Sequence, residues 1–159
     1  MPKVRKATAD DATAIAELIQ LKRLQYATYQ PTFWRVAADA VAQQAPYLRD
    51  VLARPDTIAL AAEADDGGLA GALIARVRPS PSVYAPGGPT CVIDDYWLAD
   101  PAAWDTLGRS LIAQASRMAK EAFGAAQLVA VCAQQDEPKR SMLRSESFTV
   151  ASEWWTRPL

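Results

Sequence analysis

Residues 90–133 read TCVIDDYWLADPAAWDTLGRSLIAQASRMAKEAFGAAQLVAVCA. Thr90 to Ala99 is rich in branched and aromatic residues, which predicts a long strand. From Trp104 to Phe123 apolar residues recur at helical spacing, and Gly124 follows as a C-terminal stop. Gln127 to Ala133 predicts a short buried strand. A strand, a helix and a second strand in this order predict a parallel pair joined by a right-handed crossover.

The segments before this unit predict two helices and a hairpin. Thr8 opens the first helix with a capping box, because Asp11 stands three residues after it. Asp65-Asp66-Gly67-Gly68 predicts a tight hairpin turn, since two positive-φ positions favour glycine. The expected elements are a strand at 4–7, helices at 8–26 and 36–53, and strands at 57–64 and 69–77.

The last residues predict a short helix over 138–146 and a final strand over 148–156. We therefore expect one α/β (α+β) domain over residues 1–159, with a mixed sheet of about six or seven strands and helices on both faces. Trp154 and Trp155 are adjacent, so one of them faces away from the core unless something covers it. Two interpretations stay open: a homodimer surface, or packing under a neighbouring helix or loop.

Composition excludes several classes of protein. The chain has 17 basic and 18 acidic residues, a formal net charge of -1, and no histidine. The balance excludes a strongly basic nucleic-acid binder, and the missing histidine excludes Ser-His-Asp and Cys-His catalysis and histidine-ligated zinc. Cys91 and Cys132 lie in apolar runs and are expected to be free thiols in a reducing compartment, with no metal. No apolar run is long enough to span a membrane, so we expect a cytoplasmic protein.

The segment 94–112 carries the residues best suited to chemistry. It passes from a strand through a turn into a helix whose first residues include Gly108 and Arg109. A helix N-terminus offers free amides and the positive end of the helix dipole, which suit phosphate. An ordinary strand-to-helix turn is the alternative interpretation of the same residues.

The element order and several strings resemble the GNAT superfamily of acyl-CoA-dependent N-acyltransferases. Residues 8–19, TADDATAIAELI, resemble that family's opening strand and first helix. Leu98 to Gly108 has the spacing of its fourth strand and its Gln/Arg-x-x-Gly-x-Gly/Ala loop. Ser147-Phe148 and Val150 resemble its Gly-Phe and closing strand. The similarity covers essentially the whole chain.

The resemblance implies acetyl-CoA as acyl donor. In that family the loop amides bind the pyrophosphate, and the fourth strand pairs with the pantetheine arm where it parts from the fifth. The cofactor-binding residues implied for this chain are Leu98, Ala103, Trp104, Asp105, Thr106, Leu107, Gly108 and Arg109.

This chain departs from the family pattern in two places. Of the loop's specified positions only Gly108 matches, and Asp105 puts a negative charge beside the expected pyrophosphate. The family's later motif, Asn-x-x-Ala-x-x-x-Tyr, maps onto Asp136, Lys139 and Leu143. The tyrosine that commonly protonates the departing thiolate is therefore absent.

Asp94 and Asp95 are the candidate catalytic residues. They are adjacent on a predicted strand, so their side chains are expected on opposite faces. The resemblance implies that a carboxylate near the fourth strand takes a proton from the acceptor amine, and Asp95 is favoured because it lies nearer the strand end. The alternative is that both are solvated carboxylates at a strand edge.

The expected function is transfer of an acetyl group from acetyl-CoA to a primary amine by direct attack, with a small molecule or a peptide as acceptor. The alternative is a degenerate GNAT-fold protein that acts as a non-catalytic binding or regulatory module. A third reading is a module that binds another phosphate-bearing ligand at the same helix N-terminus.

Overall fold

A five-stranded mixed sheet organises the computed structural model, which describes residues 2–159. The strands lie in the order of the chain: β1 (Lys3–Lys6), β2 (Thr57–Glu63), β3 (Leu69–Arg78), β4 (Thr90–Leu98) and β5 (Gln127–Ala130). The first four pair antiparallel, and β4 pairs parallel to β5. The α/β class and the parallel pair are confirmed, with five strands in place of the six or seven expected.

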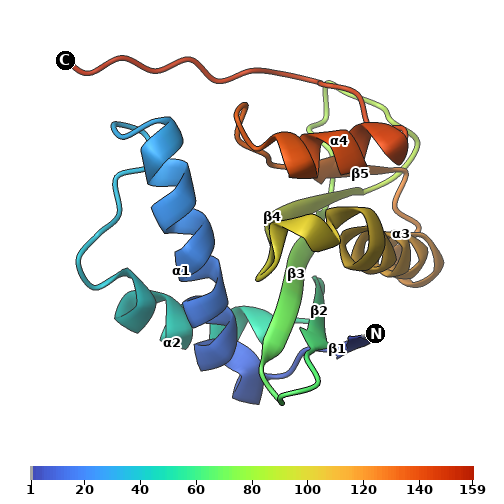
Figure 1. Ribbon diagram of the computed structural model, residues 1–159. Helices are drawn as coiled ribbons and strands as arrows, with labels where there is room; N and C mark the ends of the chain where they lie inside the picture. Colours follow the sequence, from blue (N-terminus) through green and yellow to red (C-terminus); the bar gives the residue numbers. More distant parts are fainter. Residues whose placement is uncertain (1) are drawn as a thin grey trace.

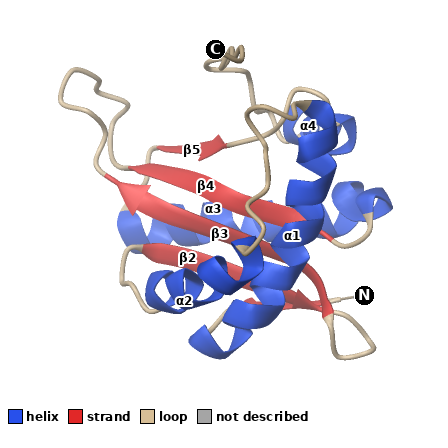
Figure 2. Ribbon diagram, turned by 90° about the vertical axis from the view of Figure 1, so that its left-hand side faces the viewer, coloured by secondary structure: helices blue, strands red, loops and turns tan. Residues whose placement is uncertain are grey.

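Helices cover both faces of this sheet, as expected. They are α1 (Ala12–Tyr29), α2 (Ala40–Leu52), α3 (Arg109–Phe123) and α4 (Glu137–Ser145). Figure 1 shows α1 and α2 on one face and α3 on the other, with α4 next to β5. Figure 2 shows α1 and α2 in front of the sheet and α3 behind it. No helix within residues 2–159 is long and apolar enough to cross a membrane.

Local signals in the sequence match the local structure. The backbone N–H of Thr8 donates to the Asp11 carboxylate at 2.7 Å, which completes the expected capping box. Residues 58–62 and 71–75 are buried without alternation, because helices cover both faces of β2 and β3. Cys91 and Cys132 are both free thiols, as expected.

The predicted final strand is wrong. Residues 149–159 pair with no strand and lie exposed, running from α4 toward the C-terminal end of α1 (Figure 1). Trp154 is 83% exposed and Trp155 is 87% exposed. The Trp154 ring lies beside the Phe33 ring, with centroids 5.9 Å apart, and is not covered by it. Strand propensity expresses fit to a neighbouring strand, and this segment has none. Packing of the tryptophans under a neighbour is thereby excluded, and the homodimer surface stays a prediction.

A β-bulge in β4 sets up the region where ligands are expected. Ile74 of β3 pairs with Asp95 and Ala75 pairs with Ile93, so Asp94 is an extra residue in the ladder. A bulge bends its strand and increases the local twist. β4 pairs with β5 only up to Ile93 and Ala130, and beyond that point its last residues have no strand on that side.

A buried hydrogen bond ties α1 to the start of α4. The hydroxyl of Tyr26 donates to the Asp136 carboxylate at 2.6 Å, and the backbone N–H of Ala133 donates to the same hydroxyl at 3.4 Å. Asp136 is the N-cap of α4 and accepts from the backbone N–H of Lys139 at 3.5 Å. The contact fixes α4 against the open end of the sheet.

Replacing Tyr26 with phenylalanine tests this link. The change leaves a buried carboxylate short of one donor, which costs about 1–3 kcal/mol of unfolding free energy. We expect a melting temperature lower by about 2–10 °C in calorimetry. Tyr29→Phe, three residues away with a half-buried ring, is the matched control and should melt like the parent. Equal melting of the Tyr26→Phe variant and the parent would contradict the role given to this bond.

Candidate functional site

Two surface cavities adjoin β4 and the turn after it, and the larger, with a volume of about 730 Å³, lies between α1, α2, the loop joining them, and the bulge of β4. Its walls combine three cations, two carboxylates and four aromatic rings with amide and small apolar side chains. The lining residues are Lys22, Arg23, Tyr26, Phe33, Trp34, Arg35, Val36, Ala37, Ala40, Gln43, Gln44, Tyr47, Asp94, Asp95 and Val131.

Asp95, the favoured base, is already engaged. Its carboxylate forms an ion pair with the Lys22 ammonium at 2.7 Å and accepts a longer bond from the Gln44 amide at 3.4 Å. Only 20% of the Asp95 side chain is exposed. Lys22 was not predicted as a site residue; the signal for it is a cation on the buried side of α1, one turn before Tyr26.

Asp94 is the freer carboxylate. Its only ion pair among the described residues is a 3.9 Å contact with Arg78, and 47% of its side chain is exposed. Partial burial raises the pKa of Asp94, and Arg78 opposes that shift. The two aspartates were expected on opposite faces of a regular strand. Both instead line the same cavity, because the bulge at Asp94 breaks the alternation of the strand.

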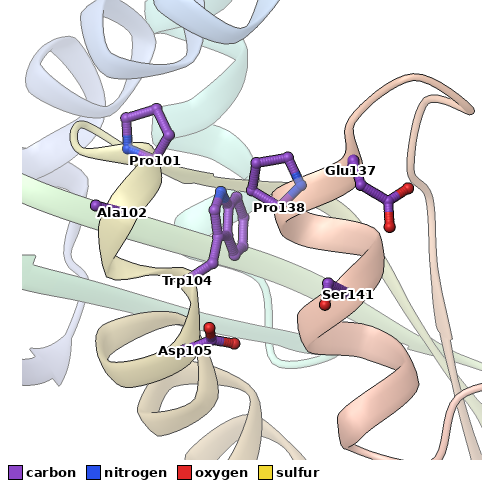
Figure 3. Close-up of a pocket in the computed structure, with 7 residues that line it drawn as sticks. All are labelled: Pro101, Ala102, Trp104, Asp105, Glu137, Pro138 and Ser141. Carbon is purple, nitrogen blue, oxygen red and sulfur yellow. The ribbon is translucent and has the colours of Figure 1, made fainter.

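The smaller cavity, of about 370 Å³, lies between the turn after β4 and α4. Figure 3 shows its two walls, with Trp104 and Asp105 among the residues of the turn and Glu137 among those of α4. A hydrogen bond from Arg144 lowers the pKa of Glu137, which is therefore an anion at neutral pH. The walls of this cavity carry two carboxylates and no cation.

Half of the eight residues predicted to hold the cofactor are used for packing. Leu98, Trp104 and Leu107 are buried in the core. A Cβ on Gly108 would lie 2.8 Å from the Trp104 ring, so this glycine makes room for tryptophan. The remaining predicted residues lie half-buried or exposed at the turn: Ala103, Asp105, Thr106 and Arg109.

The turn itself is wound into helix. Residues 101–103 form a 3₁₀ turn and residues 104–108 a π-helical turn that runs into α3. The Thr106 hydroxyl donates to the Ala103 carbonyl at 3.3 Å, and Arg109 forms an ion pair with Glu146 at 2.6 Å. The hydroxyl and the cation that were expected to face a phosphate both have partners within the chain.

Lys139 falls within the family's later motif but was not predicted as a site residue. It lies in the first turn of α4 and is 2% exposed. Its ammonium donates to the Tyr96 carbonyl of β4 at 3.2 Å and to the Val131 carbonyl, just after β5, at 3.0 Å. The available signal was its position three and four residues before Met142 and Leu143, on the buried face of α4.

An acyl-CoA does not fit the residues as they stand. Its pantetheine arm would need the gap between β4 and β5, where the Lys139 ammonium is bonded to both sides. Its phosphates would lie near the smaller cavity, whose lining includes the carboxylates of Asp105 and Glu137 and no cation to bind a phosphate. Acetyl-CoA as donor stays a prediction.

The buried ammonium predicts a particular pH dependence of stability. Desolvation lowers the pKa of Lys139 from 10.5 to about 8 in the folded protein. Between these two values the unfolded chain binds a proton that the native protein has released, so unfolding free energy rises with pH. The slope is about 1.4 kcal/mol per pH unit at most.

We expect this rise when the unfolding free energy of the wild type, measured in denaturant from pH 8 to 10, is compared with that of Lys139→Met. The methionine variant has the same tyrosines and cysteines, so their titration largely cancels in the difference. A difference that stays flat or falls over this range would show that Lys139 does not have a lowered pKa.

Comparison with known proteins agrees with this architecture. No protein-family model and no curated protein matches the chain. Among solved structures, a mutant of the BH1408 protein from Bacillus halodurans has a TM-score of 0.81 at 14% identity, covering 99% of both chains. A predicted acetyltransferase from Clostridium acetobutylicum, solved with acetyl-CoA, has a TM-score of 0.74 at 15% identity, covering 99% of this chain and 96% of that one.

An aminoglycoside 6'-N-acetyltransferase from Acinetobacter baumannii has a TM-score of 0.71 at 12% identity, covering 100% of this chain and 99% of the other. Identities this low establish a shared fold, and a fold by itself does not establish an activity. The resemblance noted in the sequence is thus confirmed at the level of architecture: the chain has the fold of the GNAT acetyltransferases.

Proposed function

We propose that the protein is a GNAT-fold binding module that holds a primary amine with an apolar body in the larger cavity. One observation supports this proposal: the Asp94 carboxylate and several aromatic rings line the same cavity. A protonated amine gains a charge-assisted hydrogen bond from a carboxylate and is attracted to aromatic faces. Phe33, Trp34 and Tyr47 supply those faces in the same cavity.

Of the three cations of the cavity only Lys22 forms an ion pair within residues 2–159, so Arg23 and Arg35 keep their charge and an amine must bind on the Asp94 side. Lys22 is paired with Asp95, and Arg23 donates to the Gln44 amide oxygen. Burial lowers the pKa of Arg23, but an arginine remains charged at neutral pH. The Asp94 carboxylate is therefore the group with most capacity to accept a new donor.

A second candidate function is acetyl transfer from acetyl-CoA to such an amine by direct attack. It is favoured by the fold shared with acetyltransferases and by the place of the bulge, because the two aspartates adjoin the gap between β4 and β5. The misfit of acyl-CoA described above weighs against it. Asp94 would be the candidate base, since Asp95 is bonded to Lys22.

Titration calorimetry with phenethylamine tests the proposal. We expect binding by the wild type and an affinity at least tenfold lower in Asp94→Asn, since a bond to a charged group is worth about 1.5–3 kcal/mol. The alcohol 2-phenylethanol has the same ring without the charge and should bind more weakly. Asp105→Asn, which changes the smaller cavity, is the matched control and should bind like the parent.

Two results would overturn the proposal. The amine site is wrong if phenethylamine binds no more tightly than the alcohol, or if Asp94→Asn leaves its affinity unchanged. Incubation of the wild type with phenethylamine and acetyl-CoA decides between the two functions. The binding module predicts no N-acetyl product by mass spectrometry above the protein-free reaction, and protein-dependent product would establish the second candidate.

A further inference from the structure

Lys139 lies against residues that line each of the two cavities described above. Its ammonium bonds to Val131, which lines the larger cavity, and lies 5.6 Å from the ring centroid of Trp104, which lines the smaller one. It also lies 5.1 Å from the Tyr96 ring centroid. The side chain therefore stands between the cavities, in the gap where β4 and β5 have parted.

The hydrogen bonds of the Lys139 ammonium lie where the ladder between β4 and β5 has ended. β4 and β5 stop pairing at Ile93 and Ala130, and the carbonyls of Tyr96 and Val131 lie beyond that point on either side of the gap. A buried carbonyl without a donor costs free energy, so the buried Tyr96 carbonyl needs a partner, whereas the Val131 carbonyl is only partly buried. Lys139 supplies donors to both at once.

Burying a lysine ammonium in the gap between β4 and β5 costs free energy. A buried ammonium loses its hydration, and no carboxylate forms an ion pair with it among residues 2–159. Its compensation comes from two carbonyls and two aromatic rings, which are also groups that an entering ligand could use. A methionine here would fill the space without burying a charge, but it would satisfy neither carbonyl.

We propose that Lys139 is a latch that closes a passage between the two cavities. Its ammonium donates hydrogen bonds to the carbonyls of Tyr96 and Val131, and its methylene chain fills the gap between β4 and β5. With the side chain removed, the passage admits a narrow arm that carries amide N–H donors, such as a pantetheine thioester. The inference rests on the proposed function, because it explains why a GNAT-fold amine site lacks a donor beside it.

Truncation at residue 139 tests the latch. We expect Lys139→Ala to bind S-acetylpantetheine in calorimetry at least tenfold more tightly than the wild type does. This probe has the arm without the nucleotide, so Asp105 and Glu137 do not repel it. Lys139→Met is the matched control: it keeps the bulk and loses the donors, and it should bind as weakly as the wild type.

Several outcomes would overturn the latch. It is wrong if the wild type binds the probe as tightly as Lys139→Ala, if the methionine variant binds as tightly as the alanine variant, or if no variant binds. Reductive methylation of the wild type gives a second test that needs no variant. Lys139 should react far more slowly than exposed Lys120, and equal rates would show that the latch is open.

The phenethylamine titration, repeated on the same three proteins, separates this proposal from the proposed function. Unchanged amine affinity in all three is expected. If none of the three proteins binds the amine while Lys139→Ala still binds S-acetylpantetheine more tightly than the wild type, the amine site is wrong and the latch is supported. If all three bind the amine and none gains the probe, the latch fails and the amine site stands.

Discussion

A single buried ammonium group joins the two strands at the point where the sheet divides. Lys139 holds the Tyr96 carbonyl of β4 and the Val131 carbonyl after β5, each within hydrogen-bond distance. The position of that ammonium depends in turn on α4, whose N-cap Asp136 is fixed by the hydroxyl of Tyr26 in α1. Elements from opposite ends of the chain thus converge on one closed gap.

The bulge at Asp94 shapes the wall of the larger cavity. It turns β4 away from β5 and brings two carboxylates to the wall of one cavity. One carboxylate balances Lys22, and the other faces the cavity with only a distant cation. The gap beside this bend is filled by the Lys139 side chain.

The sequence predicted the elements whose signals are local. The capping box at Thr8 and the hairpin turn at 65–68 need only neighbouring residues to form, and both are present, although only Gly67 of the two glycines expected there has a positive φ. The parallel pair of β4 and β5 was predicted from the order of the strand-helix-strand unit, and it is present. The bulge could not be predicted, because it depends on which residue of β3 pairs with Asp95. The strand at 148–156 was wrong for a related reason, since alternation alone does not supply a partner. Lys139 was placed by family alignment, yet its burial depends on the tertiary contact between α4 and β4.

A crystal structure of the wild-type protein grown with millimolar acetyl-CoA is the most direct test of the central claim. We expect the Lys139 ammonium on the carbonyls of Tyr96 and Val131, and no density for a pantetheine arm between β4 and β5. An arm lying along β4, with the Lys139 side chain displaced from both carbonyls, would contradict it.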